Sequence, residues 1–212
     1  MSEPRDELAR AGAHLAALGL SPGSSGNLSV RDGDTVLITP TGADLAAVDE
    51  ASLSVIGLDG SHRAGPRPSK EFPLHLAFYR RDPDTAAVVH LHSRHATAVS
   101  CLPPWSEHSA VPPLTPYFVT RVGTTPLIPY ADPGDPAQAD AVARLSYPFR
   151  AALLENHGPI TVGRSMSAAV AAAIELEEVS ALLLLLGDRT PRLLPPDVVR
   201  SLARRYGSPW SG

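Results

Sequence analysis

The chain of 212 residues contains one cysteine, Cys101. A single thiol excludes an intrachain disulfide and any zinc finger built from cysteines, which leaves His and carboxylate side chains as the available metal ligands. The lack of disulfides also favours a reducing compartment, so we expect a cytoplasmic protein. Cys101 itself is expected to be a small buried hydrophobic residue.

Long apolar runs and blocks of basic residues are also missing. Residues 168–186 form the most apolar segment, but Glu175, Glu177 and Glu178 interrupt it, and a membrane-spanning helix needs about 20 apolar residues. Residues 1–7 are charged and lack the apolar core typical of a signal peptide. The net charge is −4, with no basic block to attract nucleic acid. We therefore expect no membrane span, no export and no nucleic-acid partner.

Lysine is as rare as cysteine. Of the 18 basic residues, 17 are arginines and one is Lys70. A general preference for arginine explains the majority, and it makes the exception a candidate for a specific role. Lys70 lies directly before Glu71.

Apolar periodicity and turn residues predict alternating helices and strands in one domain of residues 1–212, long enough to bury a core without disulfides. The predicted helices span residues 4–19, 70–81, 93–101, 137–146 and 165–186. The predicted strands lie in residues 24–31, 35–39, 53–58, 86–91, 127–128, 151–155 and 160–163. Leu8, Leu15 and Leu18 are expected on the buried side of the first helix, and Ser93 and Ser165 are expected to act as helix N-caps.

Prolines concentrate between residues 102 and 136 and disfavour long helices there. We expect this segment to be a shaped loop over a site or at a subunit interface. The tail from Gly187 is rich in Pro and Arg and is expected to have less defined structure.

His90-Leu91-His92 is the most informative motif. Successive side chains of a strand alternate between its two faces, so imidazoles two residues apart project from one face and can bind one metal ion. A zinc site wants three or four ligands. Glu71, which opens a predicted helix, and His157, in a tight turn after Glu155-Asn156, complete a set suited to a divalent ion. The alternative is that these histidines are structural, since the chain has others at positions 14, 62, 75, 95 and 108.

Three short segments have the small residues, hydroxyls and backbone amides that can bind a phosphate. They are Ser25-Gly26-Asn27, Thr41-Gly42 and Ser69-Lys70, the last adding an ammonium. Each segment taken singly is equally consistent with an ordinary turn. Tyr117, in the proline-rich region, is a candidate proton donor, and its alternative is an aromatic packing residue.

The order and spacing of these motifs resemble the class II aldolase/adducin-like family over about residues 5–187. The segments that carry the resemblance are Ser25-Gly26-Asn27-Leu28-Ser29, Thr39-Pro40-Thr41-Gly42, Pro68-Ser69-Lys70-Glu71, His90-Leu91-His92-Ser93 and Glu155-Asn156-His157-Gly158. The resemblance implies a three-layer α/β/α fold around a mixed, mostly antiparallel sheet, with a tail at residues 188–212. It also implies a homotetramer with active sites between subunits.

The resemblance assigns roles to the motif residues. The implied zinc ligands, one ion per subunit, are His90, His92 and His157, with Glu71 as an acid/base that can also touch the metal. The implied phosphate-binding residues are Ser25, Gly26, Asn27, Thr41, Gly42 and Ser69. Tyr117 matches a tyrosine that donates a proton across a subunit boundary in some members, whereas Tyr206 has no clear counterpart.

Within the family, the segments around residues 69–80, 88–93 and 112–117 are most similar to members that decarboxylate 3-oxo-tetronate 4-phosphates. The expected activity is that of a metal-dependent carbon-carbon lyase of carbohydrate metabolism, giving dihydroxyacetone phosphate and CO₂ through a metal-stabilised enediolate. Lys70 replaces a serine common in the sugar-phosphate aldolases, and its charge suits the extra carboxylate of such a substrate.

Three alternatives remain. The first is a class II sugar-phosphate aldolase or epimerase of the fuculose or ribulose-phosphate type, which would use the same enediolate. The second is a non-catalytic adducin-like interaction domain, against which the intact ligand set argues. The third is a Schiff-base mechanism through Lys70.

Overall fold

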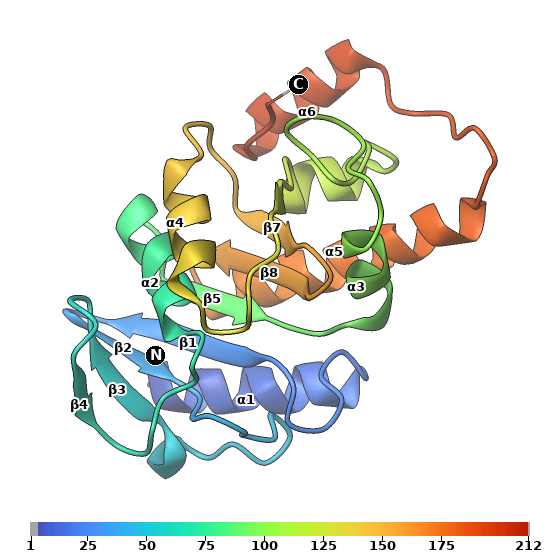
Figure 1. The fold of residues 1–212 in the computed structure, drawn as a ribbon. Coiled ribbons are helices and arrows are strands. Elements are labelled where there is room, and N and C mark those ends of the chain that lie inside the picture. Colours follow the sequence, from blue (N-terminus) through green and yellow to red (C-terminus); the bar gives the residue numbers. More distant parts are fainter. Residues whose placement is uncertain (1–3, 212) are drawn as a thin grey trace.

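The computed structural model describes residues 4–211. Eight strands form one sheet in the order β4-β3-β2-β1-β5-β8-β7-β6 (Figure 1). Every neighbouring pair is antiparallel except β6 and β7. The strands are β1 Asn27–Asp32, β2 Thr35–Ile38, β3 Ser54–Gly57, β4 His62–Ala64, β5 Ala87–His90, β6 Leu127–Ile128, β7 Ala151–Leu154 and β8 Gly158–Gly163. The predicted mixed, mostly antiparallel sheet is confirmed.

Helices cover both faces of the sheet and create the three predicted layers (Figure 1). They are α1 Pro4–Ala17, α2 Phe72–Arg81, α3 Arg94–Ser100, α4 Pro136–Arg144, α5 Met166–Leu186 and α6 Pro196–Tyr206, with shorter turns η1 Glu50–Ser52 and η2 Phe118–Val122. Alternation along β5 shows how the layers are built. Val88 joins the core beneath α2 and α4, whereas Ala87 and Val89 join the core beneath α1 and α5.

Most predicted elements are confirmed, with ends that differ by a few residues. Ser165 caps α5 as expected, because its side chain accepts a hydrogen bond from the Ala168 backbone N–H. Strand β5 ends at His90, so His92 lies two residues beyond it. The pairing with the neighbouring segment continues one residue further, since the Leu91 N–H donates to the Pro159 carbonyl at 3.1 Å.

Ser93 occupies the N-cap position of α3, but its side chain makes no capping hydrogen bond. A buried carboxylate from α5 replaces it. Glu177 accepts hydrogen bonds from the backbone N–H groups of His95 at 2.9 Å and Ala96 at 2.8 Å. These bonds lower the pKa of the Glu177 carboxyl against the opposing effect of its burial, and its negative charge suits a helix N-terminus.

Three further predictions about individual segments are wrong. Cys101 is exposed, because it follows the last turn of α3 at the surface. Leu18 is 49% exposed because α1 ends at Ala17, before the next inward-facing position. The tail contains a regular helix, α6, whose Val199 and Ala203 lie one turn apart and pack against Val119.

Among the helices of residues 4–211, none is long and apolar enough to cross a membrane.

Candidate metal centre and active site

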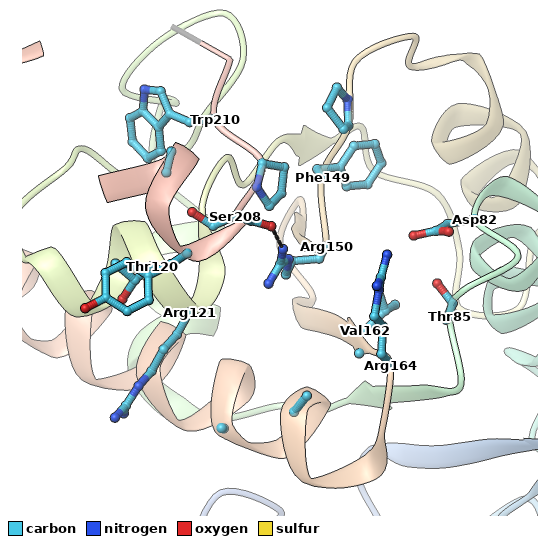
Figure 2. A pocket seen from close by; sticks show the side chains of 18 of the residues that line it. Asp82, Thr85, Thr120, Arg121, Phe149, Arg150, Val162, Arg164, Ser208 and Trp210 are labelled. Atoms are coloured by element: carbon cyan, nitrogen blue, oxygen red, sulfur yellow. Dashed lines mark hydrogen bonds between the residues drawn. The ribbon is translucent and has the colours of Figure 1, made fainter. Parts of the chain in front are cut away.

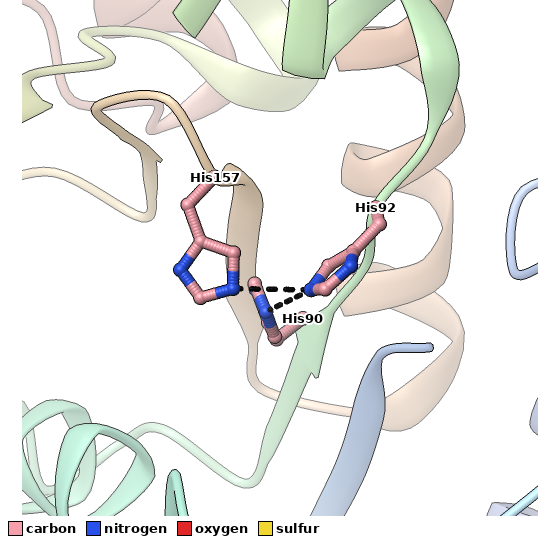
Figure 3. A group of neighbouring side chains, drawn as sticks. All are labelled: His90, His92 and His157. Atoms are coloured by element: carbon pink, nitrogen blue, oxygen red, sulfur yellow. Dashed lines mark hydrogen bonds between the residues drawn. The ribbon is translucent and has the colours of Figure 1, made fainter. Parts of the chain in front are cut away.

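Three imidazoles converge at the end of the central strand β5 (Figure 3). The Nε2 atom of His92 lies 3.2 Å from that of His90 and 3.1 Å from that of His157. His90 is fully buried, and the other two are half-buried. His157 comes from the turn between β7 and β8, and β8 pairs with β5. Sheet pairing therefore brings a residue 65 positions away to the His-Leu-His motif.

The turn that carries His157 depends on two special backbone positions. Asn156 has φ 55°, a left-handed conformation that asparagine tolerates better than most residues. Gly158 has φ 153°, and a Cβ atom there would lie 2.5 Å from the Leu91 carbonyl oxygen. Because only glycine permits so close an approach, Gly158 lets the turn lie directly against the histidine motif.

Hydrogen bonding and burial prepare the histidines as ligands. The Nδ1–H of His90 donates to the Pro159 carbonyl at 2.9 Å, which leaves the Nε2 lone pair free to face the other two rings. Burial lowers the pKa of His90 to about 4. Burial also lowers the pKa of His92 and His157, so all three rings are neutral at pH 7, the form that binds metals.

Glu71 faces the histidines from the position directly before α2, where it is the N-cap residue, although its side chain does not cap the helix. Its Oε1 lies 3.4 Å from His157 Nε2, and its Oε2 lies 3.5 Å from His90 Nε2. Burial opposes ionisation of this carboxyl, but the neighbouring His90 and a hydrogen bond from Asn27 outweigh it and lower the pKa. Glu71 is therefore a carboxylate at neutral pH.

The donor set fits a divalent metal ion. Four nitrogen or oxygen ligands placed tetrahedrally at about 2.0–2.1 Å from zinc would lie about 3.3 Å apart. The Nε2–Nε2 separations of 3.2 Å and 3.1 Å within the histidine cluster agree with this value, whereas Glu71 approaches His90 and His157 with different oxygens. Glu71 Oε1 is also buried and has no hydrogen-bond partner among residues 4–211, an arrangement that costs free energy unless something binds there. The cluster of His90, His92 and His157 is able to hold a metal.

The segments predicted to bind phosphate lie together beside Glu71. The Ser69 N–H donates to the Thr39 carbonyl at 3.1 Å, and the Thr41 N–H donates to the Arg67 carbonyl at 3.1 Å. This pairing places Thr41-Gly42, both exposed, next to Ser69-Lys70. Gly26 approaches the His90 carbonyl so closely that a Cβ there would lie 2.7 Å from it. The backbone of Ser25-Gly26 therefore borders the histidine cluster.

Two side chains of this group are already engaged with Glu71. The Asn27 amide donates to Glu71 Oε2 at 2.7 Å, and the Ser69 hydroxyl accepts a hydrogen bond from the Glu71 N–H at 3.3 Å. Both residues are 5% exposed. The structure thus gives Asn27 and Ser69 a role in holding Glu71, which the motifs did not suggest.

Lys70 is exposed at the rim of the site, with the Gly134 loop packed against it. Its positive charge contributes to the lowered pKa of His92 and of His157, after the larger effect of burial. Lys70 therefore acts electrostatically on the histidine cluster from its edge.

Tyr117 belongs to a different part of the surface. It is 61% exposed at the start of η2, where the Arg121 guanidinium lies 5.1 Å from its ring centre. Tyr206, at the end of α6, is 58% exposed. No hydrogen bond within residues 4–211 joins the Tyr117 hydroxyl to Glu71 or to the three histidines.

A cavity of about 1260 Å³ lies at the opposite end of the central strands (Figure 2). It is bordered by Thr85, just before β5, and by Gly163, at the end of β8, and it contains several arginines, including Arg150 and Arg164. None of the predicted site residues lines it. The predicted metal and phosphate ligands therefore lie away from this cavity, at the His90 end of the sheet.

His75 is the functional candidate that the sequence reasoning missed. It is fully buried in α2, and its Nε2 lies 2.6 Å from the amide oxygen of Asn27. The amide nitrogen of the same Asn27 side chain donates to Glu71. Two residue spacings in the sequence could have indicated that His75 lies near Glu71 and Asn27. His75 follows Glu71 by one helical turn, and Ser29, its other partner, shares a strand face with Asn27.

Residues 6–184 match the family model described as Class II Aldolase and Adducin N-terminal domain. Because this match covers most of the chain, the chain belongs to the class II aldolase and adducin family.

Proteins with named activities are similar to most of the chain. The chain is 43% identical to "3-oxo-tetronate 4-phosphate decarboxylase" of Pectobacterium atrosepticum, over 94% of this chain and 92% of that protein. It is 36% identical to "L-fuculose phosphate aldolase" of Escherichia coli, over 80% of this chain and 77% of that protein. The crystal structure of YgbL from Klebsiella pneumoniae superimposes with a TM-score of 0.90 at 43% identity, covering 94% and 97% of the two chains. These matches bear out both the family and the fold expected from the motifs.

Proposed function

We propose that this protein is a zinc-dependent decarboxylase that converts a 3-oxo-tetronate 4-phosphate into dihydroxyacetone phosphate and CO₂. The observation that carries the proposal is the convergence of three neutral imidazoles with the unpaired Oε1 atom of Glu71. The similarity to relatives named as 3-oxo-tetronate 4-phosphate decarboxylases supports this substrate.

In this proposal His90, His92 and His157 hold the metal, and Glu71 lies beside them with Oε1 3.4 Å from His157 Nε2. A bound zinc ion supplies Lewis-acid stabilisation of the negative charge that develops on the substrate oxygens, an effect worth several kcal/mol.

The reaction breaks the bond between the carboxylate carbon and C2. The electron pair moves toward the neighbouring 3-oxo group, CO₂ leaves, and one proton from solvent must then reach C2. Glu71 Oε1 has no hydrogen-bond partner among residues 4–211, so it is free to pass that proton to C2 directly or through water. Asn27 holds the other carboxylate oxygen and thereby keeps Oε1 aimed at the histidines.

Substrate binding uses the charged and small residues beside the histidines. The phosphate binds to backbone amides and hydroxyls of Ser25, Gly26, Thr41, Gly42 and Ser69. Lys70 pairs with the substrate carboxylate before it leaves as CO₂, which explains a lone lysine in a chain that otherwise uses arginine. We extend the proposal to a single domain over residues 1–212 that forms a homotetramer, in which the exposed Tyr117 donates a proton in a neighbouring subunit's site.

A class II sugar-phosphate aldolase is the second candidate, favoured by the 36% identity to the fuculose phosphate aldolase. Both reactions pass through the same type of electron-rich intermediate, so one site suits either. A non-catalytic adducin-like domain is less consistent with three histidines in ligand geometry. The Schiff-base alternative requires Lys70 to attack the substrate carbonyl, and borohydride would then trap substrate on the protein.

The test is CO₂ release from 3-oxo-tetronate 4-phosphate by the purified protein, before and after chelation and after zinc is restored. We expect release that chelation abolishes and zinc restores. His92→Ala is expected to lose both zinc and activity, whereas His14→Ala, at an exposed position of α1, serves as the matched control and keeps both. Absence of CO₂ release with zinc bound would overturn the decarboxylase. Cleavage of fuculose 1-phosphate under those conditions would establish the aldolase instead.

A further inference from the structure

Behind Glu71, buried polar side chains form a continuous hydrogen-bonded chain into the core. Asn27 Nδ2 lies 2.7 Å from Glu71 Oε2, and Asn27 Oδ1 lies 2.6 Å from His75 Nε2. On the other side of the ring, the Ser29 hydroxyl lies 2.7 Å from His75 Nδ1 and 2.8 Å from the Tyr79 hydroxyl. None of the five residues is more than 5% exposed.

The charge of Glu71 fixes the direction of every hydrogen bond in this chain. A carboxylate only accepts, so the Asn27 amide must turn its N–H₂ toward Glu71 and its carbonyl toward the ring. That carbonyl also only accepts, so His75 must carry its proton on Nε2. The bare Nδ1 then accepts from the Ser29 hydroxyl, which in turn accepts from Tyr79.

Burial keeps His75 and Tyr79 in these protonation states. Burial lowers the pKa of His75 to about 3, so the ring is neutral at physiological pH. Burial also raises the pKa of the Tyr79 hydroxyl, which therefore keeps its proton and donates it. Within the network, Glu71 Oε1 is the one side-chain atom left without a partner, and it is the atom 3.4 Å from His157 Nε2.

We propose that His75 is a positioning residue, whose Nε2–H locks the Asn27 amide so that the Glu71 carboxylate is held by one oxygen and presents the other to the histidine cluster. Without this donor, the buried Asn27 carbonyl has no partner, and the amide keeps only its hydrogen bond to Glu71. Asn27 then loses its fixed place, and with it the Glu71 carboxylate loses the support that aims Oε1 at the histidine cluster. The effect on turnover rests on the proposed function, whereas the tautomer of His75 does not.

The first test needs no variant. Nitrogen-15 NMR of the intact protein distinguishes the two neutral tautomers of a histidine ring, and the His75 signals are assigned through their connection to its backbone. We expect a proton on Nε2 and a bare Nδ1 at neutral pH. A proton on Nδ1 would overturn the proposal, whether or not the protein decarboxylates anything.

The second test compares two substitutions of His75. In His75→Gln the side-chain amide N–H₂ occupies the place of Nε2 and still donates to Asn27. In His75→Asn the shorter amide reaches only the place of Nδ1. Loss of an outer contact that orients a site residue costs about 10- to 100-fold in activity. We expect His75→Asn to lower kcat by this factor with unchanged KM and one bound zinc, and His75→Gln to retain most of the wild-type kcat.

Ser29→Ala is the matched control, because it removes a hydrogen bond from the same buried ring but leaves Nε2–H facing Asn27. We expect a smaller loss of kcat than in His75→Asn. Equal losses in all three variants would show that His75 only packs the core and would refute the positioning role. If neither His75 variant folds, the tautomer in the intact protein decides. An intact protein that releases no CO₂ would instead count against the proposed function.

Discussion

Gly158→Ala should separate the turn that carries His157 from the His90-Leu91-His92 segment. The added Cβ would lie 2.5 Å from the Leu91 carbonyl oxygen and 3.2 Å from the Thr97 hydroxyl. Real Cβ contacts are essentially never shorter than 3.0 Å, so the turn must move by at least about 0.5 Å, since the opposing atom is backbone. Metal-ligand distances tolerate only about ±0.2 Å. His157 would therefore leave ligand distance unless β5 and β8 also shift.

The expected result has two parts. We predict that zinc affinity falls about 10- to 100-fold, the usual cost when the support of a metal ligand is lost. We also predict a loss of about 1–3 kcal/mol in the free energy of unfolding, typical of backbone strain. For a chain of this size each kcal/mol lowers Tm by roughly 2–4 °C. Competition with a chromophoric chelator measures the affinity, and urea unfolding of the metal-free protein measures the stability.

Gly33→Ala separates strain from displacement. Gly33 has φ 60° in the turn between β1 and β2, and no atom lies within 4 Å of a Cβ built there. This control should lose a similar amount of stability from the left-handed backbone, yet bind zinc as the wild type does. The reasoning would be refuted if Gly158→Ala bound zinc with wild-type affinity, or if Gly33→Ala lost affinity equally.

Three further perturbations test other parts of the site. Glu71→Gln should lower kcat by about 10²- to 10⁴-fold, the usual contribution of a positioned acid/base, with zinc still bound; a wild-type kcat would remove Glu71 from the chemistry. Lys70→Arg keeps the positive charge, so it should raise KM modestly and leave zinc content unchanged, whereas Lys70→Met should raise KM strongly. Steady-state kinetics compares the pair, and equal KM values would exclude the ion pair. Acid should destabilise the metal-free protein, because burial lowers the pKa of His90 to about 4 and of His75 to about 3 from an ordinary value of 6.5. Below pH 6.5 the unfolded chain binds protons that the folded chain does not, so stability present above that pH is lost as the pH falls toward 4 and below. Urea midpoints at pH 7 and pH 5 check the sign, and an unchanged midpoint would contradict it.

Helix caps, turn residues and apolar periodicity predicted most helices and strands correctly, because these features depend only on residues close together in the sequence. The Ser165 cap and the apolar run behind it set the start of α5. The predictions for Leu18 and Cys101 failed because exposure at the end of a helix depends on what packs there. The tail helix α6 was missed because its two buried residues, Val199 and Ala203, gain stability only from packing on η2.

The sequence motifs also predicted the residue types of the candidate site. Nitrogen and oxygen ligands were expected from a His-x-His pair, a glutamate and a further histidine. In the structure each of these four side chains has a ligand atom within 3.5 Å of a ligand atom of another. The motifs did not reveal that Asn27 and Ser69 hold Glu71, because either side chain alone also reads as part of a turn.

The amino-acid sequence alone specified the family and the candidate ligands through motifs that act over a few neighbouring positions, and the resemblance to that family implied the layers. Only the folded chain decided which atoms meet. Asn27 and Glu71 are 44 positions apart, and His75 reaches Asn27 across 48. Whether a carboxylate oxygen is held or left free depends on hydrogen bonds between a strand and a helix, and these exist only once the sheet and the layer above it have packed.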